Sequence, residues 1–129
     1  MLKTMDEVPL TMVSTILSLD LMISSLKSCS VIAIDLEHHS YRSYFGFTCL
    51  MQVSTGEADF IVDTLELRSD LHRLNEVTTN PNICKVFHGG QSDVKWLQKD
   101  FGIYLVNIFD TFFAAQQVIL VSELHSRLI

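Results

Sequence analysis

Two carboxylates stand close together in the sequence Ile34-Asp35-Leu36-Glu37, at the end of a run of β-branched residues. In an extended strand, successive side chains point to opposite faces, so Asp35 and Glu37 project to one side and Leu36 to the other. Neighbouring carboxylates repel each other, and burying them costs free energy unless a cation compensates. A hard divalent ion such as Mg²⁺ prefers these oxygen ligands. The pair indicates a metal site; a solvated strand end with two unconnected acids is the alternative.

A third carboxylate, Asp93, follows a second apolar run in the segment 86–97, which reads Val-Phe-His-Gly-Gly-Gln-Ser-Asp-Val-Lys-Trp-Leu. Strands of an α/β sheet present functional groups at their carboxyl ends, beside the helices that follow. We place Asp93 in the first turn of such a helix, where the helix dipole favours a carboxylate, although acids also occur there for helix stability alone. Together with the acidic pair after the earlier strand, Asp93 would form a two-metal site.

His38 and His39 are a weaker pair of candidate ligands. They follow the two carboxylates directly in the sequence. Adjacent side chains of an extended segment point apart, so the two rings cannot both reach one ion at a strand end. We therefore do not expect a shared metal role for them.

The elements that must position these residues follow from hydrophobic periodicity. The pattern predicts strands and helices in alternation, with a last helix capped by Asp110. The strands are expected over 31–35, 45–53, 58–62, 83–87 and 103–109, and the helices over 10–26, 65–77 and 92–100. A three-stranded meander followed by alternating helices and strands predicts an α/β fold, with a mixed five-stranded sheet flanked by helices.

The composition limits the classes of partner. The chain has 129 residues, 48% of them hydrophobic and 19% charged, as expected for one globular domain. Its 15 acidic and 9 basic residues give a formal charge of −6, so no basic surface indicates nucleic acid, and metal ions would have to neutralise a phosphate backbone. Asp6, Glu7 and Asp20 interrupt the apolar N-terminal region, which argues against a signal peptide or a membrane span.

Four stretches of the sequence carry a resemblance that extends beyond the carboxylates. They are 35–43 (Asp-Leu-Glu-His-His-Ser-Tyr-Arg-Ser), 48–52 (Thr-Cys-Leu-Met-Gln), 60–65 (Phe-Ile-Val-Asp-Thr-Leu) and 96–102 (Trp-Leu-Gln-Lys-Asp-Phe-Gly). Together they resemble the RNase D branch of the DEDD-type 3′–5′ exonucleases and, within that branch, the catalytic exoribonuclease subunits of the eukaryotic nuclear exosome. The resemblance covers about two thirds of the chain.

This resemblance implies an RNase H-like fold of the DnaQ-like exonuclease type, truncated at its C-terminal end. It divides the chain into an N-terminal amphipathic helix that leads into the domain (1–29), an RNase D-like exonuclease core (30–111) and a divergent C-terminal helix (112–129). These boundaries are expectations that rest on where the resemblance begins and ends.

The resemblance also assigns roles to the three acids. The family's first motif, Asp-x-Glu, falls on Asp35 and Glu37, and the acid of its second motif falls on Asp93. These three are therefore the expected catalytic and metal-binding residues. The implied cofactors are two Mg²⁺ ions, with Mn²⁺ as a substitute.

The implied function is a 3′–5′ exoribonuclease of nuclear RNA and rRNA processing and degradation, which releases nucleoside monophosphates by two-metal-ion hydrolysis. Its expected partners are single-stranded RNA 3′ ends and subunits of the nuclear exosome, in the nucleus and its nucleolus, with no membrane. One motif departs from the family: none of Tyr41, Tyr44 and Tyr104 is followed four residues later by an aspartate. We therefore expect the chain as written to be weakly active or inactive. A catalytically silent module that binds RNA or a protein partner is the alternative.

Overall fold

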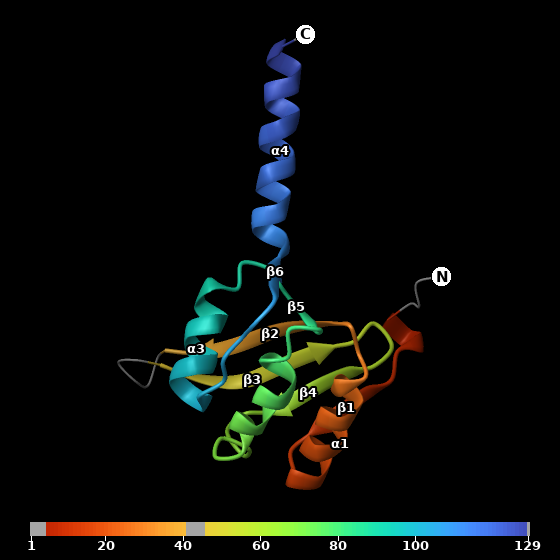
Figure 1. Cartoon of the computed structure of the whole chain (residues 1–129). Helices are drawn as coiled ribbons and strands as arrows, with labels where there is room; N and C mark the ends of the chain where they lie inside the picture. The colour runs from red at the N-terminus through yellow and green to blue at the C-terminus, as the bar shows by residue number, and fades with distance from the viewer. Residues whose placement is uncertain (1–4, 41–45, 129) are drawn as a thin grey trace.

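The structure is a computed structural model that describes residues 5–40 and 46–128. At its centre is a six-stranded mixed sheet with the strand order β1-β4-β3-β2-β5-β6 (Figure 1). The strands are β1 (Leu10–Val13), β2 (Val31–His39), β3 (Phe47–Ser54), β4 (Asp59–Asp63), β5 (Cys84–Phe87) and β6 (Ile108–Asp110). β2, β3 and β4 form the antiparallel meander, and the other neighbours pair in parallel. The predicted α/β class is confirmed, with one strand more than the expected five.

The helices are distributed unevenly around this sheet. They are the 3₁₀ helices η1 (Met5–Glu7) and η2 (Leu71–Leu74) and the α-helices α1 (Ile16–Lys27), α2 (Asn75–Thr78), α3 (Gln91–Phe101) and α4 (Thr111–Leu128). α1, α2 and α3 lie over one face of the sheet, whereas α4 extends away from the rest of the molecule (Figure 1). Among the helices in the described part of the chain, none has the length and apolar content needed to cross a membrane.

The two faces of the sheet differ in what they expose, as β2 illustrates. Ile32, Ile34 and Leu36 are at most 6% exposed and pack in the core beneath the helices. The alternate side chains of Asp35 and Glu37 are exposed on the opposite face. We call these the covered face and the open face. Burial of each large aliphatic side chain contributes about 1.5–3 kcal/mol, so the covered face stabilises the fold while the open face remains available for binding.

The N-terminal segment differs from the prediction. Leu10–Val13 does not open a helix; it forms β1, which pairs in parallel with β4. α1 begins at Ile16 because Thr15 caps it: the Thr15 hydroxyl accepts a hydrogen bond from the Ser18 amide (3.1 Å), and the Ser18 hydroxyl accepts one from the Thr15 amide (3.0 Å). The expected helix over 10–26 was therefore wrong in its first turn and a half.

Two other predicted elements are shorter than expected. Instead of one helix over 65–77, the chain turns after β4, where the Asp63 carboxylate accepts hydrogen bonds from the amides of Leu65 (3.1 Å) and Glu66 (3.0 Å), and only η2 and α2 are helical. Instead of a strand over 103–109, only β6 is extended, and Asn107 just before it has a φ of 62°. The predicted start of the strand at Phe45 lies outside the described residues.

α3 is close to its predicted span of 92–100, and its C-terminal end is fixed to β3. Gly102 ends the helix with a φ of 63°, as its position predicted. The side chain of Asp100 is only 3% exposed, and its Oδ2 accepts hydrogen bonds from the amide and the hydroxyl of Thr48, both at 2.8 Å. Burial opposes ionisation of Asp100, but these hydrogen bonds and the charge of Lys99 outweigh it and hold the pKa of the carboxyl below its usual range.

Candidate active site

The candidate site lies at the edge of the sheet where β2 and β5 end. The two strands are parallel neighbours, with Ala33 paired to Val86, so their carboxyl ends reach the same edge. Asp35 and Glu37 stand beyond Ala33 on the open face of β2. On β5, the chain continues through His88 and two glycines directly into α3. The strand topology thus brings the end of the acidic strand beside the start of α3.

Asp93 is the third residue of α3 and is only 8% exposed. Burial, followed by the negative charges of Asp35, Asp110 and Glu37, raises the pKa of Asp93 to about 6. The position beside an α-helix N-terminus favours ionisation, so the acidic surroundings act against the helix dipole. Asp93 therefore sits in a negative potential to which both acids of the β2 pair contribute.

This arrangement can attract a cation without enclosing it. Within residues 5–40 and 46–128, no three carboxylate, histidine or cysteine side chains are placed so that they alone would hold a metal ion. The donors present, carboxylates in a partly buried acidic environment, match the chemistry of Mg²⁺ or Mn²⁺. Mg²⁺ usually keeps several of its waters and takes only one or two carboxylates. The donor set therefore fits a partly hydrated divalent ion.

Asp110 is a fourth acid of this region, and sequence reasoning assigned it only to a helix cap. Its carboxylate does cap α4, accepting a hydrogen bond from the Phe112 amide (2.9 Å). It also accepts hydrogen bonds from the amides of Gly89 (2.9 Å) and Gly90 (2.8 Å), the two residues before α3. Burial opposes ionisation of Asp110, but amide donors, those of Gly89 and Gly90 foremost, hold its pKa below the usual range. The signal that was available is its place at the carboxyl end of a strand beside β5.

The same corner holds His88 and the first residues of α4. The Thr111 hydroxyl lies 2.9 Å from Nδ1 of His88 and 3.2 Å from the carbonyl oxygen of Phe87, to which it donates. The His88 ring meets the ring of Phe112 edge to face, with centroids 5.9 Å apart. His88, which lies between β5 and α3, thus packs against the first residues of α4 and is hydrogen-bonded to one of them.

His38 and His39 each stack on an aromatic side chain. His38 stacks on Trp96 of α3 with ring centroids 4.1 Å apart and an interplanar angle of 9°. His39 stacks beside Phe47 at 5.6 Å. Their rings pack against different aromatic side chains.

A groove of about 780 Å³ runs across the open face. Asp35 and Gln52, which are partners in the β2–β3 ladder, both line it. It extends from Leu10 on β1 to His88 and Thr111 at the start of α4. One of the candidate carboxylates therefore borders a cavity large enough for a ligand of nucleotide size.

Comparison with known protein families gives one match over nearly the whole chain. Residues 10–126 match the model of a family described as 3′–5′ exonuclease. Exosome complex component 10 of Rattus norvegicus is 57% identical over 114 residues, which cover 88% of this chain and 13% of that protein. The chain thus spans about an eighth of the length of this curated relative.

Solved structures agree with the sequence match. The catalytic core of RRP6 from Trypanosoma brucei is 50% identical, with a TM-score of 0.81 over 86% of this chain and 33% of its own. RNase D from Escherichia coli, an exoribonuclease involved in structured RNA processing, is 26% identical, with a TM-score of 0.73 over 81% of this chain and 28% of its own.

Proposed function

The chain belongs to the 3′–5′ exonuclease family and has the RNase H-like fold of its RNase D-like structural neighbours, and from this premise we propose that it acts on the 3′ end of single-stranded RNA. The reaction would be hydrolysis that releases nucleoside monophosphates with the help of two divalent ions, Mg²⁺ or Mn²⁺. The observation that carries the proposal is the acidic cluster where β2 ends and α3 begins, since Asp35 and Glu37 act together on the ionisation of Asp93.

Each acid has a role in this proposal that follows from its position. Asp35 borders the groove, so it would bind a metal ion beside the RNA end. Glu37 projects from the same face two residues further along the strand and would hold the ion on its far side. Asp93 keeps its proton up to about pH 6 and would release it when a cation arrives. The bound ions would activate water and stabilise the leaving oxygen.

Metal ions would also reconcile the charge of the chain with an anionic substrate. A chain of net charge −6 repels a phosphate backbone, and divalent ions at the acidic cluster reverse the sign of the local potential. We extend the proposal to association with subunits of the exosome, because the rat relative is named an exosome component, and to the nucleus, because the sequence resembles nuclear exosome subunits.

The alternative is a catalytically silent module that binds RNA or a protein partner. It is favoured by one sequence fact: no tyrosine of the chain has an aspartate four residues after it, whereas the resemblance implies such a pair in active members. We therefore expect slow trimming from the chain as written.

The test follows a 5′-labelled RNA with an unstructured 3′ end in the presence of Mg²⁺, Mn²⁺ or chelator. Asp35→Asn and Asp93→Asn should lower the metal-dependent trimming rate by at least about 10²-fold, because even indirect supports of metal ligands are worth about 10–100-fold. Asp59→Asn, which removes another carboxylate that lines the groove, is the matched control and should leave the rate unchanged.

Trimming that survives Asp35→Asn would contradict the assigned site. RNA binding with no trimming at any chain concentration would favour the silent module.

A further inference from the structure

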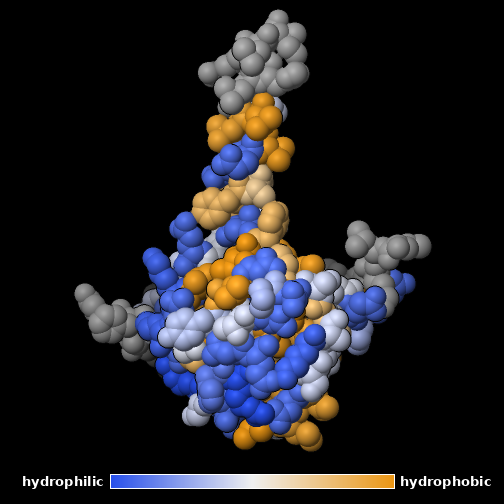
Figure 2. All heavy atoms as spheres, viewed as in Figure 1, coloured by the Kyte–Doolittle hydropathy of each residue, from blue (hydrophilic) through white to orange (hydrophobic). Residues whose placement is uncertain are grey.

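The middle of α4 presents a run of apolar side chains to solvent, between the exposed polar residues Gln117 and Ser122. Val118, Ile119, Leu120 and Val121 are 51–69% exposed, although they are consecutive and therefore face all sides of the helix. Figure 2 shows apolar side chains along this helix where it leaves the body of the molecule. A helix that is apolar all round is normally buried. α4 therefore has the surface of a helix that packs against something.

The groove across the open face has an apolar part of matching kind, beside polar lining residues that include Asp35, Gln52 and Asp59. The groove across it is lined by Leu10, Ile61 and Val86 among others, and Leu10 is 66% exposed. The groove ends at Thr111, the first residue of α4. One molecule thus exposes both an apolar helix and an apolar groove.

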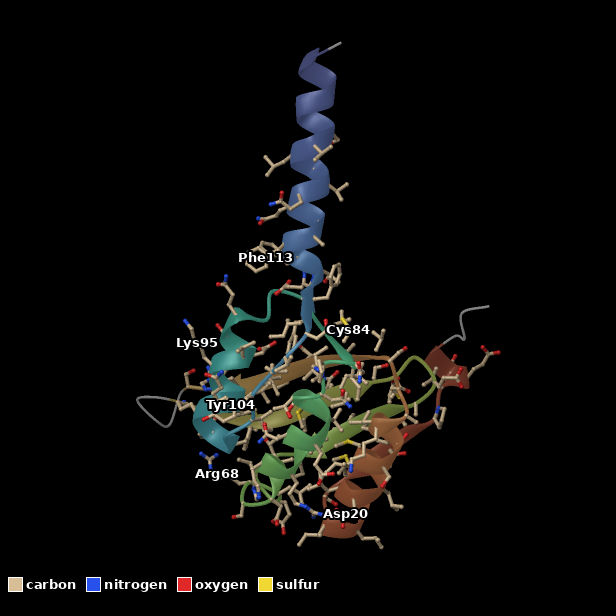
Figure 3. All side chains as sticks on the ribbon, viewed as in Figure 1. Asp20, Arg68, Cys84, Lys95, Tyr104 and Phe113 are labelled. Carbon is tan, nitrogen blue, oxygen red and sulfur yellow. The ribbon has the colours of Figure 1, made fainter. Side chains whose placement is uncertain are left out.

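The helix is held away from its own groove by its first residues. β6 ends at Asp110 and α4 begins at Thr111, so no loop separates them. Asp110 is fixed to Gly89 and Gly90, and Thr111 is fixed to Phe87 and His88. Figure 3 shows Phe113 on the stem of α4, beyond the end of the sheet. To lie over its own groove, α4 would have to break this set of hydrogen bonds.

We propose that α4 docks in the groove of a second copy of the chain, whose α4 docks in return, to give a two-fold symmetric exchanged dimer. Such an interface uses the same pair of surfaces twice. With 18 residues, α4 is about 27 Å long, and the groove crosses from β1 to β5, four strand spacings or about 19 Å. The helix is long enough to cover it. Asp35 also lines the groove, so a docked α4 and the RNA end of the proposed function would exclude each other, and the exchanged dimer would be the form without bound RNA.

The first experiment measures molar mass by light scattering on a sizing column, with the full chain at micromolar concentration. We expect the wild type at twice the mass of one chain. Leu10→Glu should give a monomer, whereas Leu17→Glu should remain dimeric. The two leucines are similarly exposed, at 66% and 70%, but only Leu10 lines the groove. Comparing these two variants distinguishes docking in the groove from non-specific hydrophobic association.

On the helix, the double variant Val118→Glu/Val121→Glu should also be monomeric. Its matched control is Gln116→Glu/Gln117→Glu, which adds the same charge to exposed polar positions of α4 and should leave the dimer in place. Circular dichroism and thermal melting establish that each variant is folded.

The second experiment mixes the two monomeric variants. The Leu10→Glu chain keeps an intact α4, and the Val118→Glu/Val121→Glu chain keeps an intact groove, so the mixture retains one complete helix-groove pair. We expect a heterodimer that neither variant forms alone, weaker than the wild-type dimer. A differently tagged copy of each chain allows its recovery by sequential affinity capture.

Three outcomes would overturn the proposal. A monomeric wild type across the micromolar range would mean that α4 has no partner of its own kind. A dimer that survives Leu10→Glu would mean that the helices pair with each other outside the groove. No heterodimer from two folded variants would mean that the helix and the groove do not meet between copies.

Discussion

The two ends of α3 each hold a buried aspartate, and the chain treats them in opposite ways. At the C-terminal end, Asp100 receives two hydrogen bonds from Thr48, and its pKa is lowered. At the N-terminal end, Asp93 faces the charges of Asp35, Asp110 and Glu37, and its pKa is raised to about 6. Hydrogen-bond donors of the fold stabilise the charge of Asp100. The charge of Asp93 is opposed by its acidic neighbours, and a bound cation would stabilise it. On this difference rests our proposal that Asp100 is a structural carboxylate and Asp93 a functional one.

Removing the charge of Asp100 should cause the largest change in the free energy of unfolding. Asp100→Asn leaves the amide and hydroxyl of Thr48 facing a neutral side chain, and each hydrogen bond to a charged group is worth about 1.5–3 kcal/mol. We expect the free energy of unfolding to fall by about 2–4 kcal/mol, measured by urea denaturation at pH 7. Asp20→Asn, which removes a partly exposed ion pair with Arg73, should cost under about 1 kcal/mol. If the two variants lost equal free energy of unfolding, Asp100 would contribute no more to stability than an exposed ion pair does.

Divalent ions should act at the other end of α3. A ligand that binds only the folded state stabilises it by about 2.7 kcal/mol at 100 times its Kd. We expect Mg²⁺ or Mn²⁺ to raise the melting temperature of the wild type and of Asp100→Asn at pH 8, and to leave Asp93→Asn nearly unchanged. A response to metal that persists in Asp93→Asn would place the ion elsewhere.

In chelator, Asp93→Asn should stabilise the chain at high pH. Asp93 releases its proton near pH 6 in the folded state but near its ordinary value of 3.8 when unfolded. Between these values the folded state binds more protons, so the contribution of Asp93 to stability falls as the pH rises. Asp93→Asn cannot ionise at this position, so its stability does not fall with pH for this reason. We expect it to exceed the wild type by about 1–2 kcal/mol at pH 8, and by nothing near pH 3.5.

Urea titrations at both pH values measure this difference directly, and the comparison with the wild type cancels groups such as Asp100, whose lowered pKa gives the opposite trend. A variant that is less stable than the wild type at pH 8 would show that Asp93 is held by donors, as Asp100 is.

The smallest expected effect belongs to Asp35→Asn. Asp35 is exposed, and its charge is the second cause of the raised pKa of Asp93 after burial. Its removal should lower the pKa of Asp93, seen in a carboxyl-carbon NMR titration, and stabilise the metal-free chain by under about 1 kcal/mol. A loss of stability would identify Asp35 as a structural residue.

The sequence predicted the elements whose pattern is local. The alternation of β2 and the periodicity of α3 were readable, because each reports one face of one element. β1 was not, since Met12 and Ile16 also fit a helical spacing with the leucines of α1. What makes residues 10–13 a strand is the ladder with β4, almost fifty residues away in the chain. A non-local partner of this kind leaves no mark in local periodicity.

The same limit applies to the site. The placement of Asp35, Glu37 and Asp93 as one site came from strand alternation and a family resemblance, and it stays a prediction. The hydrogen bonds of Asp110 to Gly89 and Gly90 were not foreseen, since they join residues about 20 positions apart. Nor was the role of Asp100, whose partner Thr48 is 52 positions away. Spacing identifies which acids can share a face, but only the fold determines which of them find donors.

The junction between β6 and α4 also links α4 to α3. With no loop at Asp110, α4 extends about 27 Å from a base that is fixed by the hydroxyl of Thr111 and the carboxylate of Asp110. That carboxylate also grips the two glycines from which α3 starts. The hydrogen bonds of one carboxylate thus connect the start of α4 to the start of α3, the helix that carries Asp93.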